Sequence, residues 1–190
     1  SDVAKWRVVL ARRTPEDGLI RGYAQLGQDL ERFRSSLAAE GVDSTAISVQ
    51  PVNAQPLWGP EGRREGYNLV QSLYVVSDDP GALERLALNP GELLSGGAVL
   101  ESSQLEYYYS GIDELKRSLL AAATGDARRR AGEIARASEG GRLGRMVSGR
   151  AGVFQITEPY STDVASYGIH STATKDKEIS VTVHATFRLD

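Results

Sequence analysis

The chain has 190 residues, of which 41% are hydrophobic and 25% charged, and a formal net charge of −3. This composition is typical of a soluble globular domain, and the small charge favours neither nucleic acid nor an anionic membrane as a partner. The absence of cysteine excludes disulfides, thiolate catalysis and cysteine-ligated metals, and no stretch approaches the roughly 20 apolar residues that span a bilayer. The length predicts one domain over residues 1–190.

The N-terminal region is predicted to form a short strand followed by a long helix. Residues 6–10 alternate as a strand does, and the charged and proline-containing residues 12–15 are expected to end it, leaving a short strand or a sheet edge. Residues 16–40 predict an amphipathic helix with Asp17 as N-cap and Gly41 as its stop. Its apolar stripe consists of Tyr23, Leu26, Leu30, Phe33 and Leu37.

The middle of the chain predicts two strands, a short helix and a further strand. Residues 47–52 are expected to form a strand, residues 56–66 a loop rich in proline and glycine, and residues 67–76 a central strand covered on both faces for part of its length. Asp78 and Asp79 before Pro80 mark the start of a helix that runs to residue 89. A strand is then predicted over residues 98–109.

The C-terminal half predicts a long helix over residues 112–139 and a strand over residues 146–157. A polar segment, residues 158–176, is too long for an ordinary loop in a compact domain, which indicates a functional, disordered or interface segment. The last strand, residues 177–189, alternates strictly, so one of its faces is expected to lie on a core. Its apolar positions are Ile179, Val181, Val183, Ala185, Phe187 and Leu189.

These elements predict an α+β fold in the order β-α-β-β-α-β-α-β-β. The sheet is expected to be mainly antiparallel, with the helices packed on one of its faces.

The reactive residues form no recognisable catalytic or metal-binding pattern. The chain has two histidines, His170 and His184, and a metal site there would need carboxylates such as Asp163 or Asp176, so both are expected to be ordinary surface residues. Nucleophile, phosphate-loop and dinucleotide motifs are absent from the sequence. We therefore assign no catalytic, cofactor-binding or metal-binding residue.

Three groups of residues are candidates for an interface. Consecutive tyrosines on a strand point to opposite faces, so Tyr108 is either exposed or covered by a partner. The polar segment carries a second group, and a mobile surface loop is the alternative there. The third group lies in an arginine-rich helix that could meet an anionic surface or an acidic neighbouring subunit, although a solvated helix face is the better interpretation. The second group consists of Tyr160, Tyr167 and Ile169, and the third group consists of Arg129 and Arg130.

Four segments, in their order, resemble the SIMPL-domain family of bacterial envelope proteins. The resemblance implies an exported or membrane-anchored α+β protein that forms oligomers, and it carries over no catalytic residue. It also implies a further strand, and often an anchor, upstream of Ser1. The segments are Leu105-Glu106-Tyr107-Tyr108-Tyr109, the helix through Ala121-Ala122-Ala123-Thr124 and Asp126-Ala127-Arg128-Arg129-Arg130-Ala131, Gly152-Val153-Phe154-Gln155-Ile156-Thr157, and Ser166-Tyr167-Gly168-Ile169.

The leading functional hypothesis is a non-enzymatic cell-envelope protein, in the periplasm or on the outer face of the cytoplasmic membrane. It would act through self-association or by binding another envelope protein, without a cofactor and without nucleic acid. The alternative is a periplasmic module that binds a small ligand or an anion in a pocket near the arginine-rich segment. An enzyme ranks third, because it would need Glu106, Asp176 or His170 to converge in one pocket.

Overall fold

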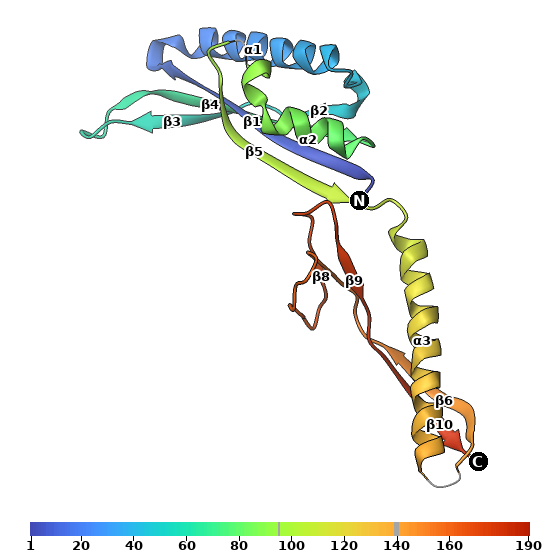
Figure 1. The fold of residues 1–190 in the computed structure, drawn as a ribbon. Coiled ribbons are helices and arrows are strands. Elements are labelled where there is room, and N and C mark those ends of the chain that lie inside the picture. The colour runs from blue at the N-terminus through green and yellow to red at the C-terminus, as the bar shows by residue number, and fades with distance from the viewer. Residues whose placement is uncertain (95, 139–140) are drawn as a thin grey trace. The chain divides into compact units, whose positions relative to one another are not determined.

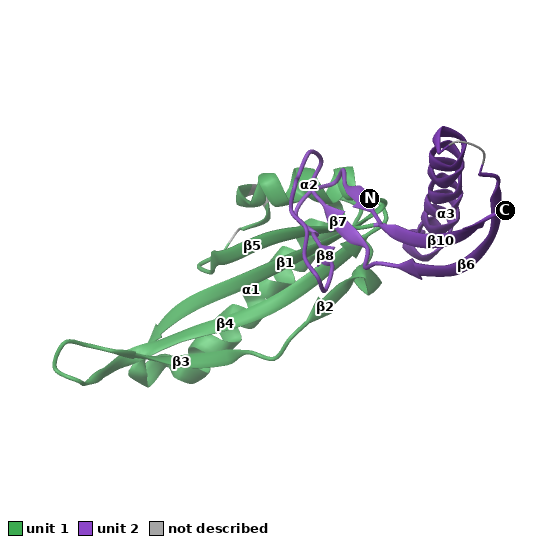
Figure 2. Cartoon of the chain, turned by 90° about the horizontal axis from the view of Figure 1, so that it is seen from below, with its two compact units in different colours: residues 1–108 green, residues 109–190 purple. Residues whose placement is uncertain are grey.

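The computed structural model describes residues 1–94, 96–138 and 141–190. The chain divides into two compact units, Ser1–Tyr108 and Tyr109–Asp190, which Figure 2 shows in green and purple. Within the described residues, no helix has the length and apolar character needed to cross a bilayer. The single domain over residues 1–190 stays a prediction.

Unit 1 contains five strands and two helices, and unit 2 contains one helix and five strands among the described residues (Figure 1). In unit 1 the elements are β1 (Val3–Pro15), α1 (Leu19–Ala39), β2 (Ile47–Val49), β3 (Asn53–Trp58), β4 (Arg64–Ser77), α2 (Pro80–Leu88) and β5 (Val99–Tyr108). In unit 2 they are α3 (Ile112–Ala137), β6 (Leu143–Ala151), β7 (Gln155–Thr157), β8 (Ile169–His170), β9 (Glu178–Ser180) and β10 (Val183–Leu189).

Unit 1 is an antiparallel sheet with α1 and α2 on one face (Figure 1). The strand order is β2-β4-β1-β5, and β3 also pairs with β4. Alternate residues of β1 and β4 point toward the helices and form one apolar core with them, as the period of two in a strand requires. Its largest fully buried side chains are Trp6, Phe33, Leu10, Leu26, Leu37, Leu69, Leu73 and Leu83.

The prediction of a short or edge first strand is wrong. β1 is 13 residues long and lies between β4 and β5, which both pair with it. Arg12 does not end the strand, because its guanidinium forms an ion pair with the buried carboxylate of Asp29 on α1. Near the end of β1, the hydroxyl of Thr14 donates a hydrogen bond to the carbonyl of Gly18 at 2.9 Å. Arg12 and Thr14, which signal a strand end in sequence, are therefore accommodated by partners on α1 and on the turn that precedes it.

The first helix begins later than predicted. A 3₁₀ turn occupies Glu16–Gly18, and Gly18 rather than Asp17 stands at the N-cap of α1, without a side-chain hydrogen bond. The buried face matches the predicted stripe except at Tyr23, which is exposed. By contrast, the predicted start of α2 is confirmed, since Asp79 Oδ1 accepts a hydrogen bond from the Ala82 N–H at 2.9 Å.

The segment of residues 56–66, predicted as a loop, is largely a two-stranded ribbon. β3 contains Pro56, and β3 pairs antiparallel with the first part of β4. Proline is tolerated because β3 lies at an edge of the sheet, where its missing N–H breaks no ladder on the outer side. The predicted strand over residues 47–52 is reduced to β2, whose three residues pair with β4.

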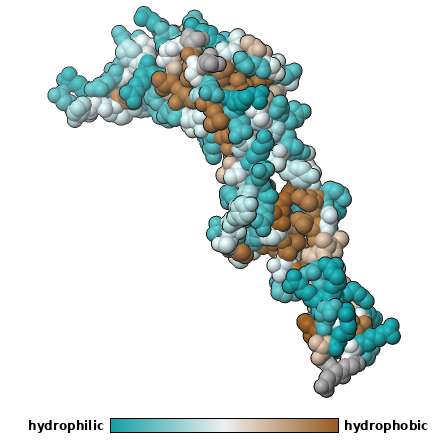
Figure 3. All heavy atoms as spheres, in the orientation of Figure 1, coloured by the Kyte–Doolittle hydropathy of each residue, from teal (hydrophilic) through white to brown (hydrophobic). Residues whose placement is uncertain are grey.

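Unit 2 buries little of its apolar surface. The two-stranded sheet β10-β6 packs against α3, and a separate three-stranded sheet has the order β8-β7-β9. Among its described residues, only Ala135, Gln155, Ile156 and Thr157 are buried. Figure 3 shows hydrophobic residues gathered on the surface of this unit, beside β9 and the first turns of α3. Apolar side chains of unit 2 are thus mostly half-buried or exposed.

Both C-terminal strands are divided. The strand predicted over residues 146–157 becomes β6 and β7, and the one predicted over residues 177–189 becomes β9 and β10, because each half pairs in a different sheet. The alternation of the last strand is confirmed from residue 178 to residue 188, although the apolar positions are half-buried rather than core, and Leu189 is exposed. The last residue of the predicted helix 112–139 lies outside the described residues, and α3 ends at Ala137.

The α+β class and the mainly antiparallel pairing are confirmed. The pair β7-β8 is parallel. Among the described residues, α1 and α2 pack on the five-stranded sheet, and α3 packs on β10 and β6. The helices therefore cover two different sheets instead of one.

Candidate functional site

The loop that joins β7 to β8, which we call the 158–168 loop, is held at its base by a buried glutamine. Gln155 is the first residue of β7, and its side-chain amide donates to the carbonyl of Ala165 at 2.8 Å. The N–H of Ala165 donates back to Gln155 Oε1 at 3.4 Å. Two hydrogen bonds to one residue orient the returning half of the loop, and a buried amide left unpaired would be costly. Gln155 therefore positions the loop.

A second set of contacts closes the loop behind β8. The Ser171 N–H donates to the carbonyl of Ile156 at 2.8 Å, while its hydroxyl donates to Glu158 Oε1. This hydroxyl hydrogen bond is the main reason why the pKa of Glu158 lies below its ordinary value. β8 pairs in parallel with β7 directly beside these contacts. The two ends of the loop are thus tied to the same strand.

Two residues of the loop have left-handed backbone conformations. Gly168 has φ +88°, and a Cβ there would lie 2.8 Å from the carbonyl oxygen of Phe154. Only glycine fits this close approach without displacing the backbone. Tyr160 has φ 65°, which is uncommon for a residue with a side chain and stores a small strain. The contacts at the base of the loop therefore hold its backbone in a specific conformation.

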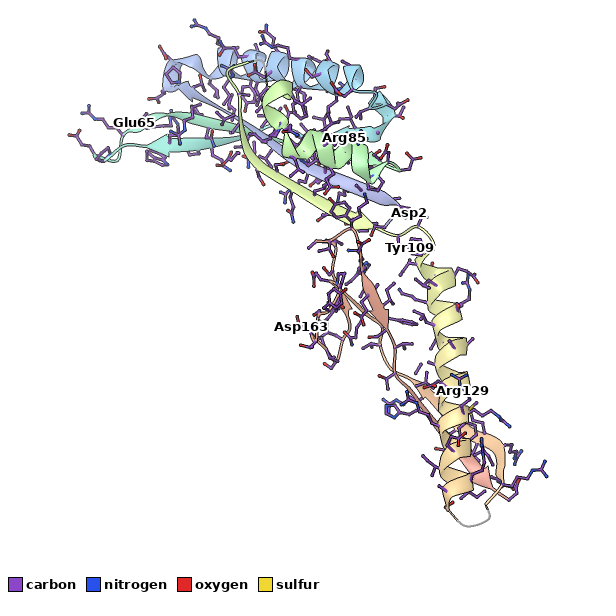
Figure 4. The ribbon with its side chains drawn as sticks, in the orientation of Figure 1. Asp2, Glu65, Arg85, Tyr109, Arg129 and Asp163 are labelled. Carbon is purple, nitrogen blue, oxygen red and sulfur yellow. The ribbon has the colours of Figure 1, made fainter. Side chains whose placement is uncertain are left out.

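The tip of the loop presents large side chains to solvent. Tyr160, Val164 and Tyr167 are 97%, 80% and 87% exposed, and the labelled Asp163 marks their part of the chain in Figure 4. Tyrosines among serine, threonine and glycine are typical of protein-binding loops, because they offer rigid contact area at a low entropy cost. The arrangement suits contact with another macromolecule.

The predicted interface residues of this segment separate into two groups. Tyr160 and Tyr167 are exposed together at the tip, whereas Ile169 is half-buried in β8. Sequence reasoning missed Val164 and the positioning residue Gln155. The polar Gln155 between Phe154 and Ile156 was the available signal, since a buried polar residue within an apolar strand needs a specific partner.

Tyr108 is half-buried on the face of the five-stranded sheet that carries no helix. Its hydroxyl donates to Glu106 Oε2 at 2.9 Å, and Lys5 Nζ lies 3.6 Å from the same oxygen. The Lys5 ammonium also lies 4.8 Å from the centre of the Tyr74 ring. Tyr108 therefore belongs to a polar cluster on the open face of the sheet, and its role in an interface stays a prediction.

Alkaline titration should reveal the two adjacent tyrosines of β5. Burial is the main cause that raises the pKa of both Tyr107 and Tyr108, and hydrogen bonds to Glu84 and Glu106 add to it. The folded state holds these protons more tightly, so their contribution to stability is complete below the unfolded value of about 10 and falls as the pH rises through it. Absorbance of the phenolates should show that Tyr108→Phe removes signal only from the late part of the titration of the eight tyrosines. An unchanged late phase would contradict this.

The arginine-rich surface of α3 is solvated, and Arg129 and Arg130 both pair with one carboxylate. Arg129 Nη2 lies 3.0 Å from Asp126 Oδ1, and Arg130 Nε lies 2.7 Å from Asp126 Oδ2. Figure 4 shows Arg129 on the outside of α3. A small pocket of about 260 Å³ beside β10 includes both Asp126 and Arg130 in its lining. An anion entering it would compete with an existing ion pair.

The remaining candidates do not form a constellation within either unit. His170 and His184 are both exposed. Glu106 belongs to unit 1 and takes part in the Tyr108 cluster, whereas Asp176 lies in unit 2. In the described residues, no group of three histidine, aspartate or glutamate side chains is placed to hold a metal ion.

The comparisons with known proteins place the chain in a family. A family model described as "SIMPL: Protein of unknown function (DUF541)" matches residues 1–187, which includes all of unit 1, the candidate loop and unit 2 up to residue 187. No curated protein matches the chain. The match covers nearly the whole sequence and agrees with the four segments that resemble this family. The chain belongs to the SIMPL (DUF541) family.

Proposed function

We propose that this SIMPL protein works without catalysis in the bacterial cell envelope, by binding protein through the 158–168 loop. The partner is a second copy or another envelope protein. The observation that carries the proposal is the contrast within the loop, whose base is held by Gln155 while Tyr160, Val164 and Tyr167 stand in solvent. A loop ordered before binding loses less entropy when a partner covers it. The family resemblance supports the location in the envelope.

The small burial of unit 2 supports binding to a macromolecule. A unit of this size is marginal unless it buries a substantial share of its surface, and exposed apolar patches on soluble proteins commonly mark interaction sites. Additional exposed apolar residues outside the loop include Ile134, Met146, Val147 and Val153. The alternative of an anion-binding module has less support, because the pocket beside the arginine-rich segment contains the Asp126–Arg130 pair.

Replacing both loop tyrosines should remove binding without unfolding the protein. Tyr160→Ser with Tyr167→Ser removes two exposed aromatic contacts, and aromatic hot spots at interfaces often contribute about 2 kcal/mol or more each, so we expect at least a 30-fold loss of affinity. Light scattering over a concentration series measures self-association. Photo-crosslinking from position 160 in intact cells identifies a different partner. Tyr23→Ser, which changes an exposed tyrosine on α1, is the matched control.

A loop that does not bind protein would give a negative result in both measurements. If the wild-type protein is a monomer, and position 160 gives no adduct beyond those formed from position 23, the loop does not bind protein. The proposal also fails if the double variant and the Tyr23→Ser control associate equally well and position 160 gives no adduct beyond those formed from position 23. Circular dichroism of each variant verifies that the fold is retained.

A further inference from the structure

The edge of the five-stranded sheet formed by β5 is long and, within the described residues, unpaired. β5 has ten residues, and none of the strands in the described ranges pairs with its outer side. The opposite side of the sheet ends in the three-residue β2 and in β3, which contains Pro56. Short strands and proline are usual devices that stop a sheet edge from pairing with another chain. β5 lacks both.

The regular part of β5 is the segment of residues 102–108. The pairing with β1 shifts between Val9 and Leu10, so that Glu101 is left without an opposite residue and forms a bulge. Beyond the bulge the ladder is continuous from Ser102 to Tyr108. Ser102, Ser103 and Gln104 are exposed and uncharged, and the segment contains no proline, glycine, lysine or arginine. This segment can accept another strand along its whole length.

We propose that β5 pairs antiparallel with β5 of a second copy, around a twofold axis at Leu105, and so joins two sheets into one. Leu105 is the central residue of the bulge-free segment, so this register gives the longest ladder that avoids Glu101. Leu105 then lies opposite its own counterpart, and Gln104 lies opposite Glu106 of the second copy. A twofold interface of this kind is self-complementary and closed. The inference rests on the proposed function only in that the partner is another copy.

The charges of β5 agree with this register. Glu106 is the only charged residue of the regular segment, and its carboxylate already contacts Lys5 and Tyr108. In the register centred on Leu105, Glu106 lies opposite the neutral Gln104 of the second copy, so no like charges lie opposite each other. A register centred between Ser103 and Gln104 would instead place Glu101 opposite Glu106, which is unfavourable. The second copy is therefore an electrostatically suitable occupant.

Cysteine substitution tests the register directly, because the chain has no cysteine of its own. On the axis, two Leu105→Cys residues would have Cα atoms about 4.5–5.5 Å apart, within the range that a disulfide spans. We expect mild oxidation to link most of this variant into dimers. Ser103→Cys, on the same face and more exposed, is the matched control, since its two copies would lie four residues apart along the ladder, over 13 Å. It should stay unlinked.

Charge substitutions at the exposed Gln104 test the same pairing without changing the core. In the Gln104→Lys variant, the lysine of each copy would lie opposite Glu106 of the other copy, which gives two attractive pairs per dimer. In the Gln104→Glu variant, like charges would lie opposite each other at the same two places. We expect a dimer dissociation constant about 2- to 30-fold lower for the lysine variant and higher by a similar factor for the glutamate variant, as measured by sedimentation equilibrium. Equal dissociation constants for the two variants would overturn the pairing.

The outcomes also separate this inference from the loop proposal. Dimers that form in solution, but that link through Ser103→Cys or through neither cysteine, overturn the β5 interface and leave binding through the 158–168 loop intact. A wild-type protein that is strictly monomeric also overturns the β5 interface. The loop is then judged by the adducts from position 160 alone.

Discussion

Asp29→Ala is expected to lower the free energy of unfolding by about 3–5 kcal/mol, the cost of leaving a buried charge unpaired. The side chain of Asp29 is 3% exposed, and that of its partner Arg12 is 16% exposed. Arg12 Nη2 and Nε lie 2.6 and 2.8 Å from Asp29 Oδ2, and Arg32 Nη2 lies 3.2 Å from Oδ1. Without the carboxylate, the Arg12 guanidinium stays inside the interface of β1 and α1, where its Nη1 keeps the hydrogen bond to Gln25 Oε1 at 3.4 Å.

Urea unfolding followed by circular dichroism measures this effect, and an exposed ion pair on α3 provides its control. Glu114→Ala removes the partner of Arg117, and the two side chains are 77% and 68% exposed. Such surface pairs contribute about 0–1 kcal/mol, so the control should change stability little. Equal losses in the two variants would show that the Arg12–Asp29 pair has no special role.

The double variant Arg12→Met with Asp29→Leu separates the cost of an unpaired charge from the value of the pair. Replacing both charges by apolar groups of similar volume is often neutral or stabilising. We expect the double variant to be more stable than Asp29→Ala. A double variant that is as unstable as Asp29→Ala would indicate that the shape of the site matters more than its charge.

Trp6→Ala is expected to lower the free energy of unfolding by about 3–5 kcal/mol, since it removes the largest side chain of the unit 1 core. Trp6 is 0% exposed, and its ring centre lies 5.9 Å from that of Phe33 on α1. Its indole Nε1 donates to the Ser103 hydroxyl at 2.8 Å, so the substitution also removes a hydrogen bond between β1 and β5. The cavity left behind adds to the lost transfer free energy.

The second of the two tryptophans is a natural control. Trp58 is 63% exposed at the end of β3, and surface substitutions usually change stability by no more than about 0.5 kcal/mol. Urea unfolding of Trp58→Ala should therefore match that of the wild-type protein. A loss at Trp58 as large as the loss at Trp6 would mean that the β3 ribbon is as important to the fold as the core.

The position of the candidate loop could be predicted from the sequence, but the fact that its base is held in one conformation could not. A polar segment of nearly twenty residues with Tyr160 and Tyr167 pointed to an interface by its length and composition alone. The clamp from Gln155 to Ala165 joins residues ten positions apart, and no local pattern announces such a pair. The same segment was therefore equally compatible with a mobile loop.

The first strand illustrates why strand ends are difficult to predict. Arg12 and Arg13 read as a strand end, because charged residues seldom continue a buried strand. Arg12 continues it because Asp29, 17 residues later on α1, supplies the opposite charge. Similarly, the period of two correctly indicated the less exposed side chains from residue 178 to residue 188, yet the chain leaves one sheet and enters another between β9 and β10.

The sequence by itself determined the α+β class, the buried faces of most elements, the start of α2 and the membership of the SIMPL family, because these depend on periodicity and on neighbouring residues. Only the tertiary structure decided which strands pair, which charges are neutralised and which loop is held. Those depend on residues far apart in sequence, whose approach is set by the packing of the whole unit and leaves no local signal. A face that must be buried can be read from its pattern, but the surface that covers it cannot.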